Sequence, residues 1–193
     1  MLKEKLAKFN IILASGSPRR QQFFKDLDLN FEIRIKSVDE IYPNHLEGSE
    51  ITDYIADLKT VPFKDELNTN DLLVTSDTIV WLDNKALGKP KDYHEAFKMI
   101  ESLSGKSHQV ITSVSLKSKN FQKVFNDTAT VYFRELTKEE IDYYIKMYQP
   151  YDKAGAYGIQ EWIGKIGIHK IEGSYFNVMG LPVHKLYKEL MNL

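Results

Sequence analysis

The stretch LLVTSDTIVWL, residues 72–82, constrains the fold of this chain more than any other segment. It is apolar at both ends and polar in its middle, and it is the strongest strand candidate in the chain. An ionised Asp77 inside a sheet is costly unless it is paired, bound to a metal or open to a cleft. The alternative is a bend at the strand end, in which Asp77 caps nearby amides. Because α/β enzymes commonly place catalytic groups on strand residues that face a crevice, we favour a functional carboxylate.

The rest of the chain alternates short strands with helices, which predicts one α/β domain over residues 1–193, with a mixed sheet and room for two lobes around a cleft. Ser17 and Pro18 suit the N-cap and first position of a helix, and Thr137 with Glu140 forms a capping box. Strands are expected at 10–14, 31–35, 72–82, 109–116 and 124–133, and helices at 19–27, 49–58, around 96–103, after Thr137, and at 181–193.

Composition narrows the possible functions. The formal net charge is -1, which argues against a nucleic-acid binder, because that function needs many cations on one face. The chain has no cysteine, and its five histidines are scattered, so a metal would be held by carboxylates and substrate oxygens, as Mg²⁺ and Mn²⁺ usually are. We find no signal peptide and no stretch long enough to cross a bilayer, so a cytoplasmic protein without a membrane partner is expected.

The segment Ser15-Gly-Ser-Pro-Arg-Arg20 breaks a local rule. Two arginines in the first turn of a helix are repelled by its partial positive charge, so they are unfavourable there. An anion bound nearby would make the arrangement favourable. Free backbone N–H groups, two hydroxyls and two guanidinium groups make a phosphate site. The alternative is that Arg19 and Arg20 point to solvent or pair with carboxylates.

The Gly-rich stretch Asp152–Gln160 has no clean period. Lys153 supplies a cation, and the Gln160 amide can both donate and accept, which suits the edge of a base. The alternative is an ordinary loop. The chain contains no Walker motif, no GxGxxG and no GxSxG, so P-loop, Rossmann and nucleophile-elbow enzymes lack support.

Seven segments together resemble the Maf family of nucleotide pyrophosphatases, once described as septum-formation inhibitors. They occur in family order and span nearly the whole chain: LASGSPRR (13–20), VDE (38–40), SDTIV (76–80), LGKP (87–90), LSG (103–105), DKAGAYGIQ (152–160) and GSYFNVMGLP (173–182). Each is weak alone, but jointly they are specific.

The resemblance implies an elongated mixed sheet with flanking helices and a central cleft, similar to the inosine triphosphatase fold. It also implies hydrolysis of dTTP and UTP to the monophosphate and pyrophosphate, with a divalent cation as cofactor, and it suggests a homodimer. By position, Asp77 matches the proton acceptor. Glu40, also expected to be catalytic, would help Asp77 hold the metal or share in activating the water. Lys59 and Lys89 are expected to be catalytic and, with Arg20, to neutralise charge that develops on the phosphates. Ser15 and Ser17 would donate hydrogen bonds to them, and Lys153 would help bind the substrate. Arg19, Thr78 and Gln160 match the residues that set base choice.

Two departures and two rival functions stay open. The family often has Ala where this chain has Ser76, and the surroundings of Lys59 differ from the family pattern, so Lys64 is the fallback. An enzyme of the same fold could instead act on 7-methyl-GTP or another modified nucleotide. A nucleotide-binding regulator of cell division would bind without turnover, but it would gain little from two carboxylates.

Overall fold

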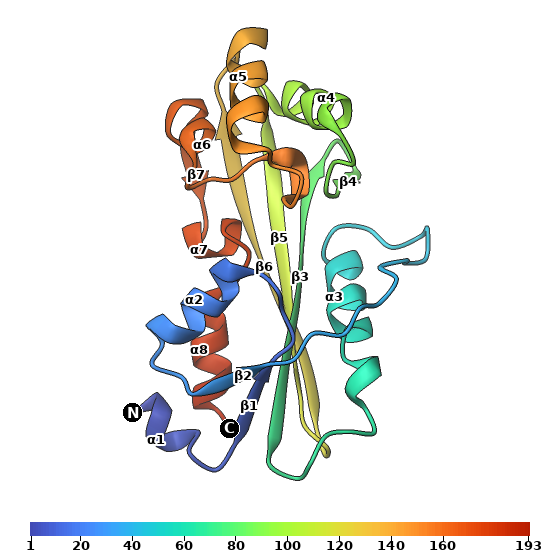
Figure 1. The fold of residues 1–193 in the computed structure, drawn as a ribbon, viewed down its shortest axis with the longest axis vertical. Helices are drawn as coiled ribbons and strands as arrows, with labels where there is room; N and C mark the ends of the chain where they lie inside the picture. Colours follow the sequence, from blue (N-terminus) through green and yellow to red (C-terminus); the bar gives the residue numbers. More distant parts are fainter. The chain divides into compact units, whose positions relative to one another are not determined.

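In the computed structural model, which describes residues 1–193, seven strands form one mixed sheet (Figure 1). The strand order is β2–β1–β3–β5–β6–β7, and the short β4 pairs with β3. β1 is parallel to β2 and β3, whereas β4 is antiparallel to β3, and β7 to β6. The strands are β1 (Asn10–Leu13), β2 (Phe31–Ile33), β3 (Asp71–Leu82), β4 (Lys85–Leu87), β5 (Ser107–Lys117), β6 (Gln122–Phe133) and β7 (Ile168–Glu172). This architecture confirms the predicted α/β class with a mixed sheet.

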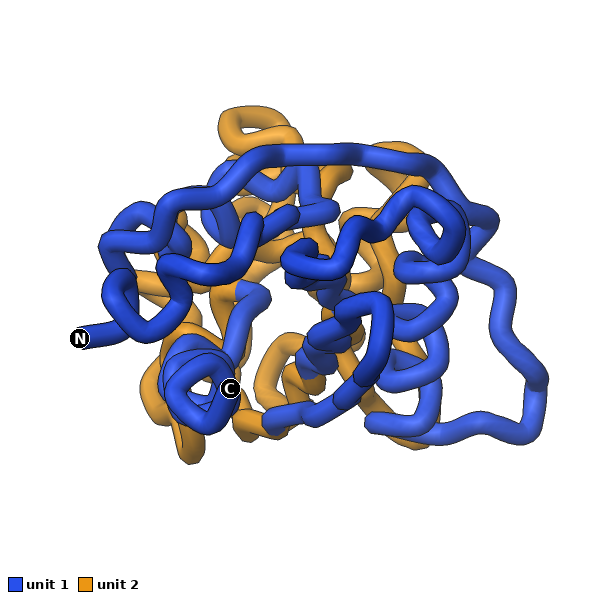
Figure 2. The backbone as a smooth tube through the Cα atoms, turned by 90° about the horizontal axis from the view of Figure 1, so that it is seen from below, with its two compact units in different colours: residues 1–77, 112–127, 180–193 blue, residues 78–111, 128–179 orange.

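The chain divides into two compact units, and each is assembled from separate chain segments (Figure 2). Unit 1 contains residues 1–77, 112–127 and 180–193, and unit 2 contains residues 78–111 and 128–179. Strands β3, β5 and β6 therefore each contribute residues to both units. The boundary in β3 falls between Asp77 and Thr78, two residues of the predicted site.

Unit 1 holds its strands between helices, with α2 and α8 on one side and α3 on the other (Figure 1). Ser17 caps α2 and Pro18 begins it, as predicted, because the proline ring fits the first turn of a helix. One apolar cluster of this unit joins β1 and β3 to the segment after α3, through Ile12, Leu73 and Phe63. The helices are α1 (Leu2–Lys5), α2 (Pro18–Asp26), α3 (Ser49–Leu58) and α8 (Val183–Met191), with a short 3₁₀ turn η1 (Val61–Phe63).

Unit 2 packs α4 against α5, and their apolar faces form one core with its strands. That core includes Ile100 of α4, Ile145 of α5 and Val110 of β5. The predicted capping box starts α5, where Thr137 accepts a hydrogen bond from the third helical residue. The helices are α4 (Tyr93–Leu103), α5 (Lys138–Tyr148), α6 (Trp162–Gly167) and α7 (Tyr175–Val178), with a 3₁₀ turn η2 (Ala154–Ala156).

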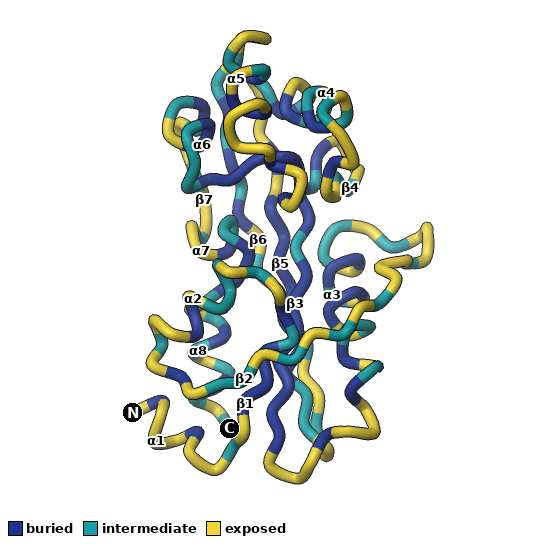
Figure 3. The backbone as a smooth tube through the Cα atoms, in the orientation of Figure 1, coloured by how far each residue is buried: buried dark blue, intermediate teal, exposed yellow.

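Strand β3 is buried along nearly its whole length, and only Thr78 and Trp81 are partly exposed (Figure 3). This confirms that residues 72–82 form a buried strand. The sequence did not predict five short elements, namely α1, β4, α6, β7 and α7, nor the 3₁₀ turns η1 and η2. No helix has both the length and the apolar character needed to cross a membrane.

Candidate active site

The segment after β1 forms a turn that uses both of its serine hydroxyls. Ser15 Oγ accepts a hydrogen bond from the backbone N–H of Ser17 at 3.3 Å. Ser17 Oγ accepts from the backbone N–H of Arg20 at 3.5 Å, which is its role as the N-cap of α2. In both bonds the hydroxyl is the acceptor, so each serine keeps its own hydrogen to donate. Such a turn can donate to an anion, as the sequence predicts for Ser15 and Ser17.

Arg20 links three chain segments of unit 1. Its Nε donates to the carbonyl of Gly180 at 2.8 Å, and its Nη1 donates to the carbonyl of Ser76 at 2.9 Å. Burial lowers the pKa of Arg20 to about 10, and the negative charge of Asp77 opposes that shift. The side chain thus holds the backbone of β3 next to Asp77 and places a cation within electrostatic range of that carboxylate.

Asp77, Lys59 and Glu40 form a charged triplet within unit 1. The Lys59 ammonium lies 2.8 Å from Asp77 Oδ1 and 2.9 Å from Glu40 Oε1. The Asp77 side chain is only 8% exposed, whereas that of Glu40 is 49% exposed. The structure therefore brings together three residues predicted from separate segments of the sequence. It also favours Lys59 over the fallback Lys64, which is exposed and makes no such contact.

Two side-chain oxygen atoms, one on Asp77 itself and one on the residue before it, have no hydrogen-bond partner. They are Asp77 Oδ2 and Ser76 Oγ, and both are buried. Buried polar atoms are almost always satisfied, so an unsatisfied pair in a strand needs a reason. A bound water, a cation or a substrate hydroxyl group at Asp77 Oδ2 would satisfy it.

A divalent cation fits this arrangement in one particular way. Side chains alone provide no cluster of three or more metal-ligating residues. Mg²⁺, however, usually takes one or two carboxylates and completes its coordination with waters and substrate phosphates. Asp77 and Glu40 are two such carboxylates. The Lys59 ammonium contacts one oxygen of each and so keeps the two carboxylates close to each other.

Arg19 is partly exposed in the first turn of α2, in unit 1. The other predicted residues belong to unit 2, on β3 and on two neighbouring loops. Thr78 is partly exposed on β3, Lys89 is exposed in the loop after β4, and Gln160 is partly exposed. The two loops are joined by a hydrogen bond of 3.0 Å from the backbone N–H of Gly155 to the carbonyl of Gly88. Unit 2 thus brings the Lys89 segment next to the segment that carries Lys153 and Gln160.

Lys153 is buried, which is unusual for a lysine, and it is paired on two sides. Its ammonium lies 2.7 Å from Asp152 Oδ1 and 3.1 Å from Glu161 Oε1. Gly155, two residues later, has a φ of +68°, and a Cβ there would lie 2.8 Å from a methyl group of Val80. Glycine is required at this position for both reasons, since an L side chain disfavours that φ and no space exists for it.

A family model described as "Maf-like protein" matches residues 10–193 of this sequence. The chain belongs to the Maf family. It is 60% identical to a dTTP/UTP pyrophosphatase of Flavobacterium johnsoniae, with all of both chains covered. It is 58% identical to a protein of the same name from Christiangramia forsetii, over 100% of this chain and 98% of the relative. These matches confirm the family resemblance on which the sequence analysis relied.

The fold also resembles that of the Staphylococcus aureus Ham1 protein, with a TM-score of 0.56. The match covers 95% of this chain and 98% of that one, at 17% sequence identity. At that identity the comparison supports the architecture of this Maf-family chain and nothing about its site.

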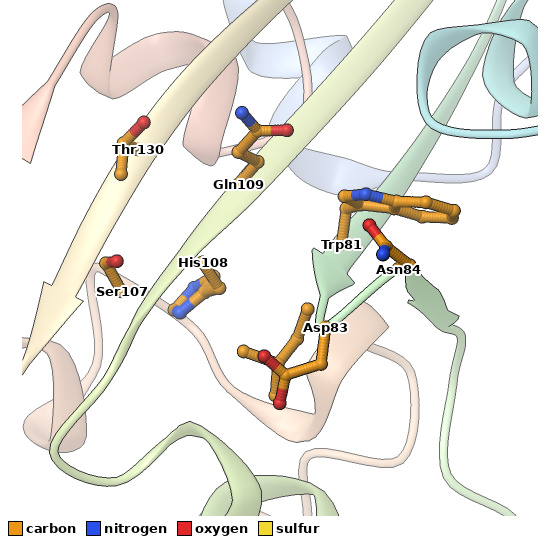
Figure 4. A pocket seen from close by; sticks show the side chains of 8 residues that line it. Trp81, Asp83, Asn84, Ser107, His108, Gln109 and Thr130 are labelled. Carbon is orange, nitrogen blue, oxygen red and sulfur yellow. The ribbon is translucent and has the colours of Figure 1, made fainter.

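A polar cavity of about 340 Å³ lies elsewhere in unit 2 and contains none of the predicted site residues (Figure 4). Its lining includes Trp81, Asp83, Asn84, His108, Gln109 and Thr130. His108 Nε2 shares a hydrogen bond of 2.8 Å with the Tyr157 hydroxyl. None of the Maf-family motifs contributes a charged or hydroxyl side chain to this cavity.

Two residues that the sequence did not point to, Tyr144 and Glu161, support the Gln160 loop. The buried hydroxyl of Tyr144 donates to Glu161, and the same hydroxyl accepts from the backbone N–H of Gly158 at 3.0 Å. Tyr144 has the spacing of an ordinary core residue of α5, and Glu161 follows directly after the last motif residue. A buried tyrosine in an amphipathic helix needs a partner for its hydroxyl, and this was the available signal.

Proposed function

We propose that the chain hydrolyses dTTP and UTP to the nucleoside monophosphate and pyrophosphate. The names of relatives at 58–60% identity over the full chain support the reaction and the substrates. The observation that carries the proposal is the buried Asp77 carboxylate, with one oxygen on the Lys59 ammonium and the other without a partner. A carboxylate with a free, buried oxygen is suited to accept a proton from a water molecule.

In this proposal Asp77 Oδ2 takes a proton from water while the water oxygen attacks the α-phosphorus. The bond between the α-phosphorus and the bridging oxygen breaks, and pyrophosphate leaves with that oxygen. Lys59 fixes the position of the other carboxylate oxygen and stabilises its negative charge. Correct placement of the water supplies much of the rate, because phosphoryl chemistry needs little covalent help from the protein.

Charge on the triphosphate would be neutralised by cations from the predicted set. Lys59, Lys89 and Lys153 are ammonium groups, and Arg20 adds a guanidinium close to Asp77. Ser15 and Ser17 would donate their hydroxyl hydrogens to phosphate oxygens. A divalent cation held by Glu40 and Asp77 would neutralise further negative charge on the phosphates when it is bound.

Base choice is assigned to Gln160, Arg19 and Thr78. Thymine and uracil share a carbonyl oxygen and an imide N–H, and the Gln160 amide can complement both. A site built around hydrogen bonds rejects a base that leaves those groups unpaired. The proposal therefore includes a preference for dTTP and UTP over cytosine and purine nucleotides.

The test measures pyrophosphate release from a panel of nucleoside triphosphates, with Mg²⁺ or Mn²⁺, for the wild type and for Asp77→Asn. We expect fast release from dTTP and UTP, and a loss of about 10²-fold or more in the variant, since general base catalysis contributes that much. Asp83→Asn, an exposed aspartate of the β3–β4 turn, is the matched control and should keep its activity. A folded Asp77→Asn with full activity refutes the catalytic assignment. Tight binding of UTP without release by the wild type would indicate the regulator instead.

The proposal also covers the setting of the reaction. The partner is a free nucleoside triphosphate in the cytoplasm, and the family resemblance supports a homodimer. Light scattering on the purified protein measures the mass directly, and a value close to twice 22.4 kDa is expected.

A further inference from the structure

The Gln160 loop is attached to the rest of unit 2 by one tyrosine hydroxyl. Tyr144 is fully buried in α5, and its hydroxyl donates to Glu161 Oε2. The same oxygen accepts from the backbone N–H of Gly158 at 3.0 Å. The hydroxyl thus contacts residues on both sides of Gln160, two before it and one after it.

The Glu161 carboxylate extends this attachment to Lys153, a predicted substrate-binding residue. Its Oε1 lies 3.1 Å from the Lys153 ammonium, and its side chain is only 19% exposed. One carboxylate therefore holds the start of the loop through Lys153 and its end through the main chain of Glu161. Burial of both partners strengthens the pair, because little water competes for the charges.

The Glu161 carboxylate also packs directly against the backbone of the loop. A Cβ on Gly158 would lie 2.7 Å from Glu161 Cδ, so the carboxylate rests directly on the glycine. A Cβ on Gly164 of α6 would lie 1.9 Å from the carbonyl oxygen of Ile159. Backbone on both sides of Gln160 is therefore confined by close contacts as well as by hydrogen bonds.

Burial also raises the pKa of the Tyr144 hydroxyl well above its ordinary value, so the group stays protonated. A neutral hydroxyl can donate one hydrogen bond while it accepts another, and the two observed bonds need both.

We propose that Tyr144 and Glu161 are positioning residues that fix the backbone of Gln160 and thereby set the preference for uracil and thymine over cytosine. This inference rests on the proposed function, because it deepens the role given there to Gln160. Cytosine differs from uracil and thymine at position 4, where the Gln160 amide would contact the base. Uracil and thymine present a carbonyl acceptor there, and cytosine presents an amino donor. An amide that donates to the first must turn over to accept from the second.

A fixed backbone is what makes such a reader selective. A loop free to shift would move the Gln160 amide away from the hydrogen bonds that it makes with uracil or thymine, and discrimination would fall. Misplacement of a contact group by about 1 Å costs roughly 10²-fold in rate. Loss of the Tyr144 hydroxyl should therefore slow UTP hydrolysis more than CTP hydrolysis.

The experiment measures kcat/KM for UTP and for CTP and compares their ratio among variants. Tyr144→Phe removes only the hydroxyl, and Tyr143→Phe, on the exposed side of the same helix, is the matched control. We expect the ratio to fall about 10-fold or more in Tyr144→Phe and to stay at the wild-type value in Tyr143→Phe. Glu161→Ala should lower the ratio too, and Glu161→Gln should restore most of it, because its amide oxygen still accepts from Tyr144.

Hydrogen exchange gives a second readout that does not depend on turnover. Peptides covering residues 152–161 should exchange faster in Tyr144→Phe than in Tyr143→Phe, while the rest of unit 2 keeps its protection. Unchanged exchange, or an unchanged UTP-to-CTP ratio in Tyr144→Phe, overturns the positioning role. A wild type that shows no preference for UTP instead overturns the proposed base choice, and the exchange data then still decide whether the two residues hold the loop.

Discussion

Replacing Lys59 with methionine tests whether the charged triplet is built as the structure indicates. Methionine keeps the apolar stem of the side chain and removes the ammonium that lies 2.8 Å from Asp77 Oδ1. Asp77 is left as a buried carboxylate without its main partner. Glu40 suffers less, because its half-exposed side chain can turn toward water.

The magnitude follows from the burial of the two partners. At 2.8 Å the Coulomb attraction is about 6 kcal/mol for an effective dielectric constant of about 20, and desolvation offsets part of it. Removing one partner of a buried pair costs about 3–5 kcal/mol, and an exposed pair such as Lys59–Glu40 adds under about 1 kcal/mol. Arg20 remains close to Asp77 and compensates part of its charge. We therefore expect a loss of about 3 kcal/mol in the free energy of unfolding.

The assay is urea unfolding of the wild type, Lys59→Met, Asp77→Asn and the double variant. Neutralising Asp77 removes the unpaired charge, so the double variant should be more stable than the sum of the single losses predicts, by about 2 kcal/mol. Lys64→Met, at an exposed lysine nearby in the chain, is the control and should change stability by under about 0.5 kcal/mol. Additive losses in the cycle would refute the interaction between the two charges.

Three further predictions concern stability. Burial lowers the pKa of His108 to about 4, below its unfolded value of 6.5. Between these pH values only the unfolded state binds the proton, so the free energy of unfolding should fall by about 3 kcal/mol as the pH drops from 6.5 to 4. His108→Gln should flatten this pH dependence in urea unfolding. Gly164→Ala should cost about 3 kcal/mol or more, because its Cβ would overlap the carbonyl of Ile159, whereas Gly88→Ala, with nothing within 4 Å, should cost under about 1 kcal/mol in the same assay. Thr137→Ala removes the N-cap of α5 and should lower the thermal unfolding midpoint, at a cost of about 1 kcal/mol.

The parts of the fold that were predicted correctly are those with a strong local signal. The helix that begins at Ser49 shows apolar periodicity, and α2 and α5 begin at recognisable caps. Residues 161–178 gave no such signal. There α6 contains Gly164 and Gly167, which weaken helix propensity, and β7 is a short edge strand without clean alternation. These elements depend on tertiary packing, which a single sequence does not display.

The site shows the same division between local and distant information. Placing Ser17 at the helix start needed only neighbouring residues. The sequence could not predict the hydrogen bond from Arg20 to the carbonyl of Gly180. The partner is 160 positions away, and any residue type could supply that main-chain atom. The support of Gln160 by Tyr144 was missed for a related reason, since an amphipathic helix explains a buried tyrosine without any loop contact.

Because each unit is built from separate chain segments, the two units become complete at different times during translation. Unit 2 has all its residues once position 179 has been translated, whereas unit 1 still lacks residues 180–193. Helix α8 and the carbonyl of Gly180 that holds Arg20 therefore reach unit 1 last. Until then the apolar surface that α8 will cover stays exposed on the nascent chain, and transiently exposed apolar surface is prone to aggregation. Loss of a few C-terminal residues should thus harm folding yield more than their small share of the chain suggests.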